Sequence, residues 1–137
     1  MRRQSKGSIR LMKYLIDAYA WIEYLEGSKK GEIVNNYLES EDEIIILPIT
    51  IAEVVSKVKR KNGNFELAYN IMISKSKVIE TTPKISKNAG ILHAEMRKKY
   101  PQFGIVDASI IETAKLINAK IVTGDPHFKD FKESIIL

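Results

Sequence analysis

The chain has 137 residues, 45% hydrophobic and 28% charged, which is typical of one soluble globular domain. It has no cysteine and two histidines, which excludes disulfides and thiolate metal sites and argues against structural zinc. The net charge is +5, but four of the 22 basic residues precede residue 13, so the rest of the chain is close to neutral and bulk charge does not establish nucleic-acid binding: Arg2, Arg3, Lys6 and Arg10.

The N-terminal segment is basic and lacks the apolar stretch of a signal peptide, and no later run has the length of a membrane span. The apolar pattern begins at Lys13, directly after Met12. We therefore expect residues 1–12 to be a poorly ordered extension, with Met12 as the natural start. Residues 13–137 are expected to form one domain of a cytoplasmic protein.

Short strand-like runs alternate with amphipathic stretches of helix length, which predicts an α/β domain with a mainly parallel sheet. In chain order we expect a strand at 13–17, helices at 18–26 and on to about 40, a strand at 43–47, helices at 51–61 and 65–75, a weak strand at 77–80, helices at 83–100 and 105–118, a strand at 120–123, a helical turn at 126–130 and a strand at 134–137. Right-handed crossovers make this a three-layer α/β/α sandwich. In such folds ligands bind beyond the carboxyl ends of the strands.

Four acidic residues lie at or near these strand ends and helix starts. Asp17 ends the first strand, and Asp125 follows the strand at 120–123. Glu53 is expected in the first turn of the helix after the second strand, and Asp107 near the start of a later helix. These four residues are the candidate site.

Taken singly, each acid also has a structural explanation. Thr50 and Glu53 match a capping box, in which the glutamate serves the helix start. Asp125 and Asp17 are suitable N-cap residues. Asp107 carries a negative charge, which is favoured near the positive, N-terminal end of a helix dipole.

The joint interpretation differs, because four such helix starts would bring four carboxylates together. Two unit charges about 4 Å apart repel by roughly 4 kcal/mol at an effective dielectric near 20, whereas a helix cap contributes about 1 kcal/mol. The cluster therefore needs protonation or a bound cation. Oxygen ligands alone suit Mg²⁺ or Mn²⁺, and such an ion activates water and stabilises charge on a phosphate.

Four segments of the chain resemble the PIN-domain family and, within it, the VapC-type toxins of bacterial and archaeal toxin–antitoxin pairs: residues 14–22, 49–54, 106–111 with Ala114, and 121–128. The resemblance implies a five-stranded parallel sheet in the order 3-2-1-4-5, with Asp17, Glu53, Asp107 and Asp125 in one pocket. It also implies Mg²⁺- or Mn²⁺-dependent endonucleolytic cleavage of RNA, which we expect to be single-stranded, together with a homodimer and inhibition by a small VapB-like antitoxin. The Thr123 hydroxyl would orient an acid or a metal-bound water.

The chain departs from the family pattern at Tyr19. Members usually carry a small polar residue two positions after the first aspartate, and this chain has tyrosine there. Either the tyrosine hydroxyl takes over the contact near the site or the contact is lost. The second case leaves open a catalytically weak or inactive PIN-fold module that binds RNA or protein.

Other patterns point to weaker hypotheses. A metal-free ribonuclease would use two imidazoles as acid and base, but nothing in the sequence pairs His93 with His127. A receiver-type signalling domain is disfavoured because no strand-end lysine follows the later strands. The basic runs at 57–61 and 97–99 end helices, where the dipole favours cations; contact with an RNA backbone is the alternative.

Overall fold

The computed structural model describes residues 11–137, and the first ten positions of the expected N-terminal extension lie outside this range. Within it, the backbone of Met12 is tied to the start of the second strand. Its N–H donates to Asp42 Oδ1 at 2.9 Å, and its carbonyl accepts from the Glu43 N–H at 2.9 Å. No helix among residues 11–137 is long and apolar enough to cross a membrane.

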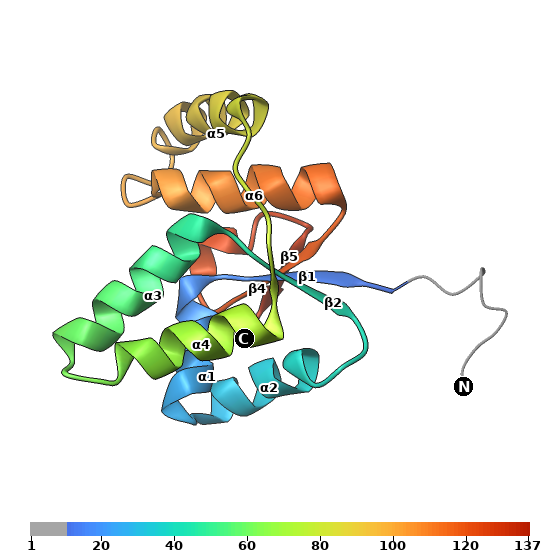
Figure 1. Cartoon of the computed structure of the whole chain (residues 1–137). Helices are drawn as coiled ribbons and strands as arrows, with labels where there is room; N and C mark the ends of the chain where they lie inside the picture. Colours follow the sequence, from blue (N-terminus) through green and yellow to red (C-terminus); the bar gives the residue numbers. More distant parts are fainter. Residues whose placement is uncertain (1–10) are drawn as a thin grey trace, which may run out of the picture.

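The elements follow the expected alternation of strands and helices (Figure 1). They are β1 (Lys13–Ile16), α1 (Ala18–Glu26), α2 (Lys29–Leu38), β2 (Glu43–Ile46), α3 (Pro48–Arg60), α4 (Phe65–Lys75), β3 (Lys77–Val78), α5 (Pro83–Met96), α6 (Ile105–Ile117), β4 (Lys120–Thr123), the 3₁₀ turn η2 (Pro126–Phe128) and β5 (Ser134–Ile136). All neighbouring strands pair in parallel, in the order β3-β2-β1-β4-β5. The predicted sheet order is confirmed.

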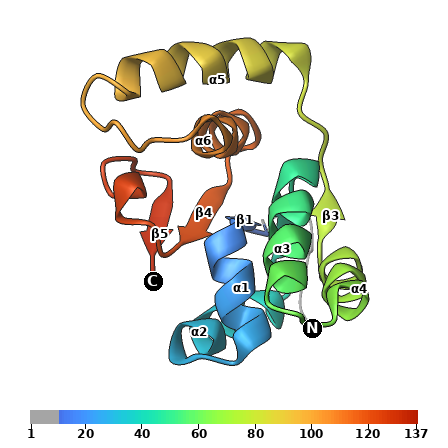
Figure 2. The ribbon, with the colours of Figure 1, turned by 90° about the vertical axis from the view of Figure 1, so that its left-hand side faces the viewer.

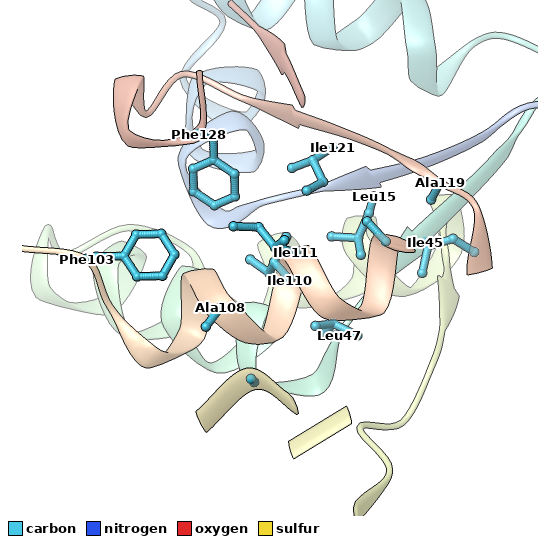
Figure 3. Close-up of a cluster of buried hydrophobic side chains, with 12 residues drawn as sticks. Leu15, Ile45, Leu47, Phe103, Ala108, Ile110, Ile111, Ala119, Ile121 and Phe128 are labelled. Atoms are coloured by element: carbon cyan, nitrogen blue, oxygen red, sulfur yellow. The ribbon is translucent and has the colours of Figure 1, made fainter. Parts of the chain in front are cut away.

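Alternate strand residues supply two separate cores, because successive side chains of a strand point to opposite faces. Leu15 and Ile121 belong to a cluster with buried residues of α5 and α6, which Figure 3 shows. Ile16 and Val122 belong to a second cluster with Trp21 and buried residues of α1 to α4. Helices α5 and α6 therefore cover one face and α1 to α4 the other (Figure 2). The expected three-layer sandwich is confirmed.

Helix α3 begins three residues earlier than expected, which moves Glu53. The expected helix starts at residue 51, but Pro48 is the first helical residue, a position where its fixed φ and missing N–H cost nothing. Glu53 therefore lies in the second turn, not the first. The proposed capping box is wrong, because Leu47 is the N-cap and makes no side-chain cap bond. Thr50 is fully buried inside the helix, and its hydroxyl has no partner in the described part of the chain.

Several other elements end earlier than expected; for example, β3 ends at Val78 and not at residue 80. Helix α5 ends at Met96 and not near residue 100, and the Tyr100 N–H closes a turn onto the Met96 carbonyl at 2.7 Å. Strand β1 ends at Ile16, because Asp17 already serves as the N-cap of α1. Asp17 thus stands at the junction of strand and helix, at the carboxyl edge of the sheet.

Candidate functional site

The four acids singled out from the sequence line one pocket of about 300 Å³. Asp17 follows β1, and Asp125 follows β4, the strand beside β1. Glu53 comes from α3 and Asp107 from the first turn of α6. Segments separated by long stretches of sequence therefore converge because parallel strands end at the same edge of the sheet.

Two of these carboxylates are held by the backbone of the helix they start. Asp17 Oδ1 accepts a hydrogen bond from the Ala20 N–H at 2.9 Å. Asp107 Oδ2 accepts one from the Gly104 N–H at 3.1 Å. The structural explanation of these acids and their convergence in a pocket thus hold together, since capping engages one oxygen and leaves the other for further contacts.

Thr123 connects the two acids that follow the central strands. It is fully buried, and its Oγ1 accepts the Asp125 N–H at 3.0 Å while its hydroxyl bonds to the Asp17 carboxylate. Asp125 Oδ1 in turn accepts the His127 N–H at 2.9 Å, with His127 Nδ1 3.3 Å away. One hydroxyl therefore fixes the relative position of Asp17 and the loop that carries Asp125.

Burial and mutual repulsion make the pocket unfavourable for negative charge. Asp17 is 6% exposed, and burial, with the charges of Asp107 and Asp125 adding to it, raises its pKa to about 7, although its hydrogen bonds act in the opposite direction. Burial and the Asp107 charge raise the pKa of Glu53. Burial also raises the pKa of Asp107, an effect that the Gly104 bond offsets in part. A cation in the pocket would lower the free-energy cost of ionising these carboxyl groups.

The donor chemistry fits a hydrated Mg²⁺ or Mn²⁺ ion. All four acids offer oxygen, yet no three acidic or histidine side chains among residues 11–137 already form a close metal-binding group. These two observations agree if the ion keeps much of its water shell. Mg²⁺ is commonly held by one or two carboxylates and several waters, and a pocket of about 300 Å³ leaves room for those waters.

Tyr19 forms the wall of this pocket beside the Asp125 loop. Its hydroxyl accepts a hydrogen bond from Lys30 Nζ at 3.1 Å, so the observed partner is a lysine of α2 and not one of the four acids. Its ring lies against Gly124, where any Cβ would overlap the ring. Gly124 also lines the pocket, and it was missed in the sequence, where a lone glycine between Thr123 and Asp125 was its only signal.

The two histidines have different partners. His93 lies 3.3 Å from Arg97 and 6.5 Å from the Phe103 ring centroid. His127 lies beside Asp125 and 5.8 Å from the Tyr100 ring centroid. Neither contact pairs the two imidazoles, so the two-histidine mechanism gains no support.

A separate hollow of about 340 Å³ lies among α1, α3 and α4. Its walls are mostly apolar, with Leu25, Val58 and Ile71 among them. Its one acid, Glu26, pairs with Lys61 at 2.9 Å, and Lys57 is the other charged residue of its wall. It therefore offers no chemistry comparable to that of the acidic pocket.

Comparisons with known proteins agree with the fold described above. The family model described as PIN domain matches residues 14–134, and no curated protein matches the chain. The fold is similar to VapBC2 of Rickettsia felis bound to a promoter DNA fragment (24% identity, 92% of this chain and 98% of that chain, TM-score 0.69). It is also similar to a toxin–antitoxin complex from Klebsiella pneumoniae (20% identity, 89% of this chain and 95% of that chain, TM-score 0.69). A third similar structure is Mycobacterium tuberculosis VapC20, described as a Sarcin-Ricin loop cleaving toxin (12% identity, 87% of this chain and 95% of that chain, TM-score 0.71).

Proposed function

This chain belongs to the PIN-domain family, and on that basis we propose that it is a metal-dependent endoribonuclease of the VapC type. The observation that carries the proposal is the convergence of Asp17, Glu53, Asp107 and Asp125 on one pocket. Folding is not served by placing these acids together, since burial and repulsion already raise the pKa values of three of them. A function that binds a cation explains the arrangement.

In this proposal the four acids hold Mg²⁺ or Mn²⁺, which supplies an activated water and stabilises charge on the phosphate. Burial and the neighbouring charges raise the pKa of Asp17 to about 7, so a bound cation would favour the ionised form of this carboxyl group. Thr123 keeps Asp17 and Asp125 in register through its two hydrogen bonds. Glu53 approaches from α3, on the side opposite Asp125.

The proposal includes the partners of a toxin. One similar structure is described as a toxin–antitoxin complex and two others as VapBC bound to DNA, which supports a small VapB-like antitoxin as a partner of this chain. Large apolar side chains on α5 and α6 are exposed, among them Ile91, Ile105 and Leu116. A second copy of the chain would cover them, which supports a homodimer. Single-stranded RNA in the cytoplasm is the proposed substrate.

A second candidate is a catalytically weak or inactive PIN-fold module that binds RNA or protein. The observation in its favour is Tyr19, whose hydroxyl bonds to Lys30 where relatives are expected to carry a small polar residue near the acids. The two candidates differ in one property, because an inactive module binds its partner without metal-stimulated cleavage.

The test incubates the purified full chain with total cellular RNA and with an unstructured single-stranded RNA, in Mg²⁺, in Mn²⁺ and in EDTA. We expect cleavage with either metal and none with EDTA. Asp107→Asn should lower the rate by at least about 100-fold. Glu112→Gln is the matched control, because Glu112 is an acid of the same helix that pairs with Lys115 at 3.4 Å. Equal cleavage by both variants, or no cleavage with any metal, would reject the proposal.

A further inference from the structure

We propose that a groove between α1 and α3, which leads out of the acidic pocket, binds the phosphate backbone of the RNA strand through Lys57 and Arg60. The proposal rests on the nuclease function above and assigns the part of the chain that attracts its substrate. A pocket lined by four acids repels a polyanion, so a nuclease of this kind needs cations close to the pocket but outside it.

The groove is continuous with the acidic pocket. A hollow of about 500 Å³ between α1 and α3 is lined by Tyr19 and Ile22 on one side and by Ser56, Lys57 and Arg60 on the other. It shares Ala18, Tyr19 and Glu53 with the acidic pocket. The two helices contact each other and lie side by side in Figure 2. A strand lying in this α1–α3 groove would therefore pass directly into the pocket.

The charge of the groove changes sign along α3. Glu53, Lys57 and Arg60 follow one another at intervals of four and three residues, so they lie on one face of the helix. At a rise of 1.5 Å per residue, Lys57 stands about 6 Å and Arg60 about 10 Å from Glu53 along the helix axis. The negative end of the groove faces the acids, and the positive end lies within two helical turns of it.

Within the described part of the chain, the two groove cations have no acidic partner. Among residues 11–137, neither Lys57 nor Arg60 forms an ion pair, although Glu53 is one turn from Lys57. Arg60 makes one contact through its Nε, to Ser56 Oγ at 3.4 Å. Their charge is therefore available to a phosphate.

The other two cations at the end of the same helix are engaged elsewhere. Lys61 pairs with Glu26 at 2.9 Å, and Lys59 lies over the Phe65 ring at 5.3 Å from its centroid. The basic run at 57–61 thus divides into two residues that line the groove and two that do not. This division provides a control with the same change in charge.

The opposite wall adds a third cation at the rim. Lys30 donates to the Tyr19 hydroxyl at 3.1 Å, and its ammonium lies 5.4 Å from the ring centroid. Tyr19 is 41% exposed, so this rim is open to a strand that lies in the groove. Phosphate contacts of this kind give affinity and register but little sequence preference.

The test measures binding without cleavage. A short fluorescent single-stranded RNA is titrated with the full chain in EDTA at several NaCl concentrations, and the anisotropy gives the affinity at each. Lys57→Gln/Arg60→Gln should weaken binding at low salt and reduce the slope of log affinity against log salt by about 1.4, since each phosphate contact contributes about 0.7 for single strands. Lys59→Gln/Lys61→Gln removes the same charge from the same helix and should leave the slope unchanged.

Failure of this proposal is distinguishable from failure of the nuclease function. Equal slopes for the two double variants, no change in either, or no RNA binding by the unaltered chain would overturn the groove assignment, even if metal-stimulated cleavage is observed. Displacement of RNA from the groove by polyglutamate at matched charge concentration would assign the groove to an acidic protein partner and also overturn it. Slope loss in the groove variant alone, with no cleavage in any metal, would retain the groove and reject the nuclease.

Discussion

Asp17→Asn should stabilise the metal-free protein above neutral pH. Burial, with the Asp107 and Asp125 charges, raises the pKa of Asp17 from 3.8 to about 7, which at 1.36 kcal/mol per pH unit corresponds to about 4 kcal/mol of destabilisation when the group is ionised. Asparagine caps a helix as well as aspartate does, so the Ala20 bond should persist. The raised pKa already includes the opposing effect of the Thr123 bond, so the gain should approach about 4 kcal/mol at a pH where Asp17 is fully ionised.

The sign of the pH dependence follows from the two pKa values. Between pH 3.8 and about 7 the native state keeps the Asp17 proton that the unfolded chain has lost, so the unaltered protein loses stability as pH rises through this window. The advantage of Asp17→Asn should be small below pH 4, grow by about 2 to 3 kcal/mol between pH 5 and pH 8, and then level off.

Urea unfolding in EDTA, followed by the fluorescence of the fully buried Trp21, measures this difference at each pH. Glu66→Gln, an exposed acid of α4, is the control and should show no such growth. In Mg²⁺ the unaltered protein should gain stability by ligand binding, while the Asp17 variant gains less. An Asp17→Asn advantage that stays constant from pH 5 to pH 8 would refute the argument from crowded, buried carboxylates.

Two further predictions concern the walls of the site and the helix that carries Glu53. Gly124→Ala should lower the free energy of unfolding by about 1 to 3 kcal/mol, because its methyl group overlaps the Tyr19 ring. Adding Tyr19→Ser should restore most of the loss, and additive effects in this double-mutant cycle would contradict the contact. Thr50→Val should raise the free energy of unfolding by about 1 kcal/mol, because it replaces a buried hydroxyl without a partner by a methyl group of the same shape. Destabilisation in urea unfolding would show that the hydroxyl is satisfied in solution.

Much of the fold followed from local patterns in the sequence. The apolar residues of the run at 43–47 predicted a strand, and Ile44, Ile45 and Ile46 are buried in β2. The turn signal at Asn62 and Gly63 separates α3 from α4 as expected. These predictions succeeded because burial on two faces and turn formation are decided within a few residues.

The start of α3 was not predicted, because Pro48 is compatible with two outcomes. Proline ends a strand by withholding an N–H, and it begins a helix for the same reason. The choice depends on whether Leu47 is buried at the end of the strand, which is a tertiary property. The position of Glu53 depends on this choice, so the turn of the helix on which it lies was assigned wrongly.

The site was predicted by combining acids that are individually explained by capping. Asp17, Asp107 and Asp125 do cap helical segments, whereas the capping box proposed for Glu53 is wrong. The partner of Tyr19 was not predictable, because Lys30 comes from a neighbouring helix whose packing the sequence does not reveal. The division of the 57–61 run was accessible from helical spacing, since Lys57 and Arg60 share a face with Glu53.

The two roles of the capping acids, helix capping and the proposed cation binding, have a consequence for how such a domain evolves. In the proposed function each capping aspartate meets two requirements at one position, one set by the backbone and one by the cation that it would bind. Asparagine meets the first and fails the second, so a lineage can lose its chemistry in one step and still inherit an intact fold with its surfaces unchanged. Inactive descendants of such an enzyme, retained for what they bind, should therefore carry amides where their ancestors had acids. These substitutions should be found at the helix starts.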